Sequence, residues 1–206
     1  MNALLLLLLD SRAPAGAHHH SGAMEAAIST GLVTGLADLE DFCLARLRTS
    51  ARVAAAFAAS ACHLHADFSS ERTLAPAPAT PDAWAELDAE LDARTPSEAM
   101  RAASRQLGGG LLRLLRSLRP EADLVTPWAQ GGKPASHHPL VLGAGVSLAG
   151  GTPELAARAA ALATCTSPAS AAVRLLGLDP FAVQAMLARL APGIDDCARR
   201  AARTAA

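Results

Sequence analysis

The sequence contains few residues of several kinds, and each shortage excludes a class of protein. Aromatic residues make up 3% of the 206 positions, tyrosine is absent, and Lys133 is the only lysine. The 18 basic residues are balanced by 19 acidic ones, so there is no basic excess of the kind that binds nucleic acid. The chain is nevertheless 51% hydrophobic, which is too apolar for a disordered protein. Its length suits one domain with its own core.

Cysteine is also scarce, and its spacing argues against a metal site. The four cysteines are far apart in the sequence, with no Cys-x-x-Cys pair: Cys43, Cys62, Cys165 and Cys197. Without an export signal, the default state of such residues is a free, buried thiol. We therefore expect neither a disulfide nor a structural metal at these positions.

Long hydrophobic runs are missing as well. The six leucines of Leu4–Leu9 are too few to span a bilayer, which takes about 20 apolar residues. They also lack the preceding basic residues of a signal peptide. The apolar stretch 140–178 is interrupted by three charged residues, Glu154, Arg158 and Arg174. We expect a cytoplasmic protein with no membrane contact, in which the leucines form a buried helical segment.

Proline follows a capping residue at five places, and each place predicts the start of a helix. Ser, Thr and Asp side chains accept hydrogen bonds from the free N–H groups of a first turn, and proline fits the first helical position. The five pairs are Thr80-Pro81, Thr95-Pro96, Thr152-Pro153, Ser167-Pro168 and Asp179-Pro180. Glu98 adds a capping box, since its side chain can reach back to the Thr95 N–H.

Helical periodicity predicts an all-α, single-domain bundle of roughly eight to ten helices over residues 1–206. After Thr95, apolar residues recur every three or four positions until Pro120 ends the pattern. Further helices are expected at 39–61, 84–91, 139–150, 155–164, 169–176 and 181–191, with a frayed one at 195–205. Flexible connectors are expected near 74–81 and 120–138, and a C-terminal tail near 193–206.

Three glycines, Gly108-Gly109-Gly110, lie inside the helix that starts after Thr95. They lack the Gly-Lys-Ser/Thr ending of a phosphate-binding loop. Three glycines in a helix cost about 1 kcal/mol each relative to alanine. They indicate either a kink or a close backbone approach by a neighbouring helix or a partner, and we favour close packing.

Three adjacent histidines, His18-His19-His20, raise the question of a metal site, because neutral imidazole suits nickel, zinc and copper. Adjacent side chains point in different directions, however, so a polar loop is the simpler interpretation. Further ligands would have to come from the remaining histidines, His63, His65, His137 and His138. A standalone nickel or zinc protein using His18–His20 stays open as an alternative.

No pattern predicts catalysis. Ser21 with His20 and Glu25 resembles a triad in composition only, since the three lie in one short stretch without a Gly-x-Ser-x-Gly elbow. We therefore predict that the protein is not an enzyme. A row of arginines on one helix is either a solvated face or a docking face for an acidic or nucleotide-carrying partner: Arg101, Arg105, Arg113 and Arg116.

Four segments, in order along the chain, resemble the UreF family of urease accessory proteins. The first, "LLDSRAPAGAHHHSGAMEAA", is similar to the family's N-terminal signature, which falls on Asp10, Ser11, Pro14, Gly16, His20, Ser21, Gly22 and Glu25. The second, "LDARTPSEAMRAASRQLGGGLLRL", carries Glu98, Arg101, Ser104 and Arg105. The third and fourth are "HHPLVLGAGVSLAG", with His138, and "SAAVRLLGLDPFAVQAML".

Two positions depart from the family pattern. Ala23 stands where a second glycine is usual, and residues 176–180 replace the usual Pro-Leu-Gly-Gln. The second departure puts in doubt any contact assigned to that glutamine.

The resemblance implies an all-α protein that forms a homodimer and binds a second accessory protein, UreD (also called UreH). The pair would recruit the GTPase UreG and deliver nickel to apo-urease with GTP hydrolysis. It implies no tightly bound cofactor, with nickel present only in transit. The expected partner-binding residues are Asp10, Ser11, His20, Ser21, Glu25, Arg101, Ser104, Arg105 and His138.

Two mechanisms are compatible with this role. In the first, which we favour, the chain is a scaffold that holds UreG beside UreD, with His20 and His138 among the residues lining the contacts or the nickel path. In the second, Arg101 or Arg105 acts as an arginine finger, a group that raises GTPase rates by about 10³–10⁵. The remaining rival is a helical interaction domain unrelated to urease.

Overall fold

The computed structural model describes residues 3–10, 21–71, 81–122 and 136–205, and these ranges contain nine helices and no strand. The predicted all-α fold class is confirmed. The helices are α1 (Ala3–Leu9), α2 (Met24–Ser29), α3 (Leu36–Arg48), α4 (Ser50–Glu71), α5 (Pro81–Ala93), α6 (Glu98–Leu118), α8 (His138–Leu148), α9 (Pro153–Leu176) and α10 (Pro180–Thr204).

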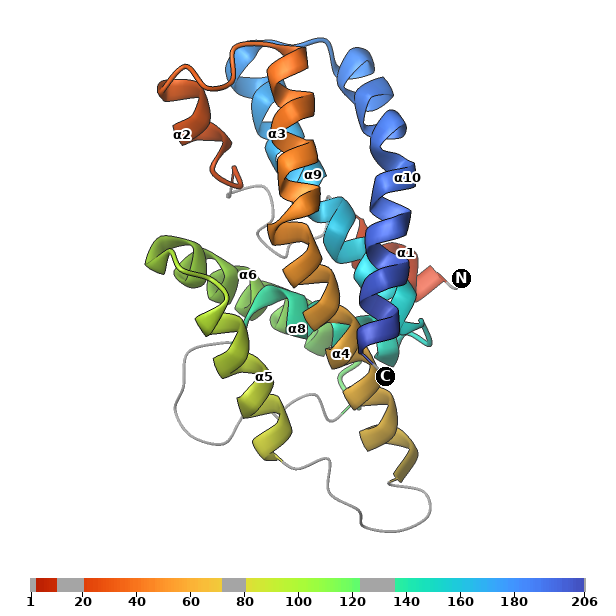
Figure 1. Ribbon diagram of the computed structural model, residues 1–206. Helices are drawn as coiled ribbons and strands as arrows, with labels where there is room; N and C mark the ends of the chain where they lie inside the picture. The colour runs from red at the N-terminus through yellow and green to blue at the C-terminus, as the bar shows by residue number, and fades with distance from the viewer. Residues whose placement is uncertain (1–2, 11–20, 72–80, 123–135, 206) are drawn as a thin grey trace.

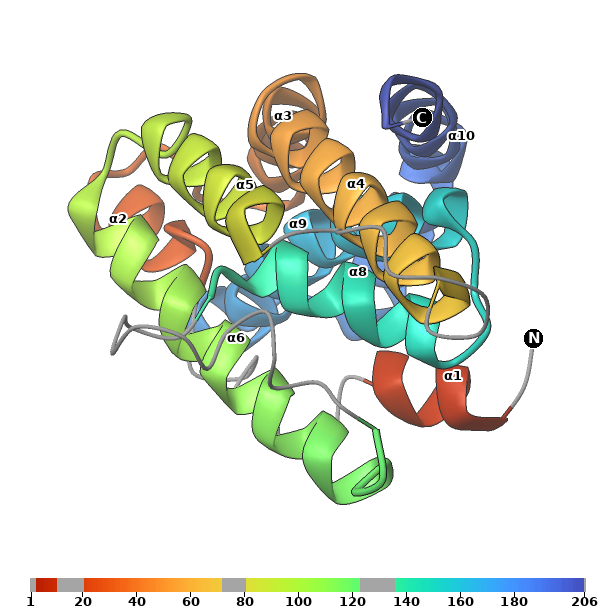
Figure 2. The ribbon, with the colours of Figure 1, turned by 90° about the horizontal axis from the view of Figure 1, so that it is seen from below.

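Helix α4 is the centre of the arrangement. It packs against α8, α9 and α10, and α9 also contacts α3 and α10 (Figure 1). Helix α6 lies against α8, on the side of the molecule away from α10, and α5 contacts α4 (Figure 2). The four helices α3, α4, α9 and α10 therefore form one body, to which α5, α6 and α8 are added on one side.

Small side chains make the close helix contacts within this body and between its helix α4 and α8. Ala55 and Ala59 of α4 and Ala161 of α9 are fully buried in one apolar cluster. A Cβ atom at Gly143 of α8 would lie 2.2 Å from the carbonyl oxygen of Ala58 in α4, so only glycine permits this approach. Alanine and glycine thus let the helix backbones come close together.

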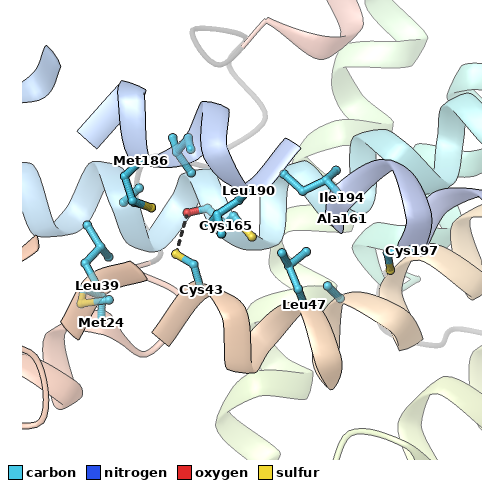
Figure 3. Packing of buried hydrophobic residues seen from close by; sticks show 14 of the residues in the cluster. Met24, Leu39, Cys43, Leu47, Ala161, Cys165, Met186, Leu190, Ile194 and Cys197 are labelled. Atoms are coloured by element: carbon cyan, nitrogen blue, oxygen red, sulfur yellow. Dashed lines mark hydrogen bonds between the residues drawn. The ribbon is translucent and has the colours of Figure 1, made fainter. Parts of the chain in front are cut away.

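Larger side chains fill the space between α3 and α10. Leu39, Cys43 and Leu47 of α3 lie opposite Met186, Leu190 and Ile194 of α10 (Figure 3). All four cysteines are free and buried, as predicted, and the Cys43 thiol donates to the Cys165 carbonyl oxygen at 3.8 Å.

The N-terminal leucines form α1, in which Leu5 and Leu8 are buried in an apolar cluster with α6 and α8. Their neighbours Leu6 and Leu7 are exposed. By length and composition α9 is apolar enough to cross a membrane, but its residues Ala157, Ala161 and Cys165 are fully buried inside the bundle. Helix α9 therefore has the features of a core helix.

Four of the five predicted caps lie on described residues. Thr152 accepts a hydrogen bond from the Leu155 N–H, and Asp179 accepts from the N–H groups of residues 181 and 182, so these two are confirmed. Thr95 is not the cap of α6, because Ser97 accepts from the Met100 N–H and Thr95 donates its hydroxyl to the Leu91 carbonyl. Thr80 lies outside the described residues.

The predicted start at Ser167-Pro168 is wrong, because α9 continues through Pro168. Likewise α10 continues through Pro192, so the predicted helices 181–191 and 195–205 are one. Ile194, Cys197 and Ala201 are buried along this continuation, which explains why residues 193–204 form a packed helix where a frayed end and tail were expected. Conversely, the predicted helix 39–61 is divided at Thr49 into α3 and α4.

The predicted connectors fall largely on residues 72–80 and 123–135, which lie outside the described residues. Helix α5 begins at Pro81, and α8 begins at His138, the last residue of the second predicted connector.

Candidate functional site

Four of the predicted site residues meet where α5, α6 and the start of α8 come together. Arg101, Ser104 and Arg105 lie on α6, and His138 is the first residue of α8. We call this site the polar junction and define it as Asp88, Asp92, Arg101, Ser104, Arg105, Ser136, His137 and His138. It brings residues of the second and third family-like segments into contact.

The start of α8 receives its capping groups from neighbouring helices. His137, its N-cap residue, makes no side-chain cap of its own. Asp88 of α5 accepts from the Ser136 hydroxyl at 2.7 Å and from the His137 N–H at 3.2 Å. Ser104 of α6 accepts from the His138 N–H at 3.3 Å. Since a first turn leaves four N–H groups without helical partners, these contacts fix α5 and α6 to α8.

Arg105 lies at the centre of the charges. Its Nη2 atom is 2.7 Å from Asp88 Oδ2 and 2.8 Å from Asp92 Oδ2, and its side chain is 16% exposed. Partial burial opposes the charged form, but the two carboxylates outweigh it and raise the pKa of Arg105. Arg101 contacts Asp92 more loosely, with Nε 3.9 Å from Oδ1, and its Nη1 donates to the carbonyls of Thr95 and Pro96 at 2.7 and 2.9 Å.

The two histidines differ in their surroundings. His137 is fully buried, with Nε2 2.8 Å from Asp92 Oδ1, and its Nδ1 has no hydrogen-bond partner among the described residues. Desolvation opposes the charged form of Asp92, but hydrogen bonds from Arg105 and His137 outweigh it and lower its pKa. Burial lowers the pKa of His138 to about 4, so this imidazole is neutral at pH 7.

Gly108 explains how the start of α8 approaches α6 so closely. A Cβ atom there would lie 2.0 Å from the Ser136 carbonyl oxygen and 3.1 Å from the His137 carbonyl carbon. The prediction of close backbone packing is confirmed at this glycine, and the neighbour is a helix of the same chain.

Three junction residues have the types and spacing of a metal site. One ligand atom each from Asp88, Asp92 and His137 lie within 4.8 Å of one another. The guanidinium of Arg105, however, already bridges both carboxylates. A cation would have to displace this positive charge, so we interpret the cluster as an ion-paired network that joins helices.

The N-terminal predicted residues belong to a different surface. Asp10 is half-buried directly after α1, and the Ser21 hydroxyl accepts from the Glu25 N–H at 3.4 Å on α2. Helix α2 packs on α9 and takes no part in the polar junction. Four further candidates, Ser11, His18, His19 and His20, lie outside the described residues.

An open groove of about 730 Å³ runs between α4 and α5. His63, Glu86 and Glu90 are among its lining residues, together with Ala205 at the end of α10. It contains none of the predicted site residues.

Asp88, Asp92 and Ser136 were not among the residues predicted from the sequence, and His137 was expected only as a possible further metal ligand. The signal for the aspartates was their four-residue spacing on a short helix, which places both carboxylates on one face. Nothing in the sequence alone tied that face to residues 45 positions or more further along.

The chain as a whole is similar to known proteins. The UreF family model matches residues 33–191 of this chain. A urease accessory protein UreF from Mycobacterium sp. (strain JLS) is 44% identical over 198 residues, which cover 96% of this chain and 84% of that protein. A urease accessory protein UreF from Mycobacterium marinum is 45% identical over 189 residues, covering 91% and 79%. One from Mycolicibacterium vanbaalenii is 44% identical over 203 residues, covering 98% and 86%.

Proposed function

The chain belongs to the UreF family of urease accessory proteins, and from that premise we propose that it acts in urease maturation as an adaptor without enzymatic activity. In this role the chain binds UreD (UreH), and the pair recruits the GTPase UreG. The assembly then passes nickel, its cargo, to apo-urease with GTP hydrolysis. We place this activity in the cytoplasm, with no role for nucleic acid or a membrane.

The observation that carries the proposal is how the polar junction uses its charged groups. Arg105 of α6 pairs with Asp88 of α5. Asp88 and Ser104 each accept a hydrogen bond from the start of α8. Groups held in this way position surfaces well, because each helix is tied to two others. This arrangement supports a scaffold whose α5–α6 face is presented to a partner in a fixed geometry.

The same contacts weigh against the arginine-finger mechanism. Arg105 would have to break both of its carboxylate contacts to reach a bound nucleotide. Arg101 would have to leave the two carbonyls that it holds. We therefore favour docking over direct stabilisation of the transition state.

Exposed apolar side chains offer contact surfaces for a partner or a second copy of the chain. Phe181, in the first turn of α10, is 86% exposed, and Leu32 and Leu175 are also exposed. Leu6 and Leu7 on α1 form a second apolar surface. Scattered single residues of this kind are normal, but an aromatic ring this exposed fits a surface that is covered in an assembly.

The test is co-purification. The tagged chain is co-expressed with UreD and UreG from the same genome, and the mass of the eluted material is measured by light scattering with and without GTP and nickel. We expect a defined assembly containing both partners. Elution of the chain alone, with tight nickel binding that is lost when His18–His20 become alanine, would favour the standalone metal-binding alternative.

The same assay separates the two mechanisms. With Arg105→Glu, loss of the assembly supports docking, whereas an intact assembly with altered GTP turnover supports the arginine finger. Arg199→Glu, a charge reversal at a half-exposed position near the end of α10, is the matched control and should change neither.

A further inference from the structure

Pro168, inside α9, removes one N–H donor from the hydrogen bonds of the helix. Because proline has no N–H, the carbonyl of Thr164, four residues earlier, loses its helical hydrogen bond. Arg46 of α3 supplies the missing donor, with Nε 3.1 Å from the Thr164 carbonyl oxygen. The break in α9 is therefore satisfied by a side chain from a neighbouring helix.

The other arm of the same guanidinium holds the residues that lead into α2. Arg46 Nη1 donates to the Gly22 carbonyl oxygen at 3.0 Å. Gly22 has a φ of +59°, and a Cβ atom there would lie 3.4 Å from Pro168 Cδ. The backbone at Gly22 thus lies next to the ring of Pro168. Pro168 is also the residue whose missing N–H leaves the Thr164 carbonyl free to accept from Arg46.

The entry to α2 has a conformation that needs such support. Ala23, the N-cap residue of α2, has a φ of 69° in the left-handed region, which costs a non-glycine residue about 1–2 kcal/mol. Helix α2 has only six residues, far fewer than an isolated helix needs for stability.

Arg46 uses its charge on carbonyl groups. Among the described residues no carboxylate contacts its guanidinium, and the Phe42 ring centroid lies 5.7 Å from Cζ. Burial lowers the pKa of Arg46, as expected for a half-buried cation without an ion-pair partner. A planar fork can serve two acceptors at once, which a lysine ammonium on a flexible stem does less well.

We propose that Arg46 and Pro168 form a clamp that holds residues 21–29 on α9, and that Arg46 is thereby a positioning residue for Ser21 and Glu25. The part of this inference that concerns partner binding rests on the proposed function. The clamp itself is a property of the isolated chain, so the two can be tested separately.

Hydrogen exchange on the isolated chain tests the clamp. The amides of Met24, Ala27 and Val33 all donate to backbone carbonyls of residues 21–27. In Arg46→Met they should exchange at least about tenfold faster. The amide of Leu39 in α3 should change little. Arg46→Lys should give an intermediate effect, and Arg189→Met, which removes an exposed ion pair with Glu40, is the matched control. Unchanged exchange in α2, or equal acceleration throughout the bundle, would overturn the clamp.

Pro168→Ala tests the link between the two halves. The new N–H can bond the Thr164 carbonyl, so Arg46 is no longer needed there. In this background Arg46→Met should accelerate exchange in α2 by a factor at least about three times smaller than in the natural sequence. An equal factor in both backgrounds would overturn the role of Pro168.

Co-purification with UreD and UreG tests the functional part. We expect Arg46→Met to lower capture of the partners at least about tenfold while the Arg189→Met control captures them normally. Normal capture by a chain whose α2 exchanges faster would overturn the positioning role. If the natural chain captured neither partner, the proposed function would fail, and the exchange results would still decide the clamp.

Discussion

The contact between α4 and α9 and the polar junction of α5, α6 and α8 both hold helices together. The first does so with small apolar side chains, and the second with charged and polar ones. In the first, alanines such as Ala55 and Ala161 are fully buried, and the backbones come close because nothing large separates them. In the second, Asp88 and Arg105 join three helices through charged hydrogen bonds. The first contact depends on shape, and the second depends on each polar group keeping its partner.

This difference predicts which substitutions lower the free energy of unfolding most. Loss of a buried apolar side chain removes transfer free energy and leaves a cavity. Loss of one polar partner leaves another group without its hydrogen bond, while the net value of the intact bond is small. We therefore expect the apolar body to control stability, and the polar junction to control the relative placement of α5, α6 and α8.

The largest effect is expected for Met186→Ala in the apolar body. Met186 is fully buried between α3 and α10, so its truncation should lower the free energy of unfolding by about 2–5 kcal/mol. Chemical denaturation measures this, with Leu162→Ala, at a 43% exposed position of α9, as the control that should change little. Equal losses for the two variants would contradict the assignment of the core.

Glycine substitutions compare the close approach of α8 to α4 with that of α6 to the start of α8. Gly143→Ala and Gly108→Ala would each place a Cβ atom against the backbone of another segment, at 2.2 and 2.0 Å. Each should lower the free energy of unfolding by about 1–3 kcal/mol. Gly35→Ala, where nothing lies within 4 Å of the added atom, is the matched control. A tolerated Gly108→Ala would show that α6 and α8 are not held so close.

Asp88→Ala should cost less, about 1–2 kcal/mol, because it removes hydrogen bonds of small net value and no large apolar side chain. Its distinguishing result is local: amides at the start of α8 should exchange faster while those of α9 do not. Glu90→Gln, which removes an exposed ion pair with Arg94, should change stability by less than about 0.5 kcal/mol. Uniform faster exchange would mean that the junction belongs to the core cooperative unit.

The smallest effect is expected for His138→Gln, measured as the change in the free energy of unfolding with pH. The pKa of folded His138 is lowered to about 4, whereas the unfolded value is near 6.5, so the unfolded chain binds the proton first. This contribution to stability is complete above pH 6.5 and is lost as pH falls toward 4. We expect His138→Gln to reduce the loss in that window by on the order of 1 kcal/mol, measured by denaturation at both pH values. His65, whose pKa burial also lowers, contributes in the same window and is unaffected by this variant. An unchanged slope would contradict the lowered pKa of this half-buried imidazole.

The sequence predicted the fold class well because helix signals are local. The caps at Thr152 and Asp179 are made by residues two or three positions away. The predictions at Pro168 and Pro192 failed because tertiary contacts override the local preference. At Pro168 the donor for the freed carbonyl comes from Arg46, more than a hundred positions earlier.

The candidate site was predictable only in part, for the same reason. Family resemblance selected Ser104, Arg105 and His138, and the structure brings them together. The four-residue spacing of Asp88 and Asp92 is a weak signal, since an acidic pair on a short helix is usually a solvated face. Only the fold places them beside Arg105 and the start of α8.

The most direct test of the account compares partner capture by Asp88→Ala and Met186→Ala chains, each held well below its own unfolding transition. We predict that Asp88→Ala, with α5 released from the start of α8, loses UreD and UreG although it is the more stable of the two. Met186→Ala should retain them. Capture by Asp88→Ala at the level of the natural chain, with loss by Met186→Ala, would contradict the claim that the polar junction presents the docking face.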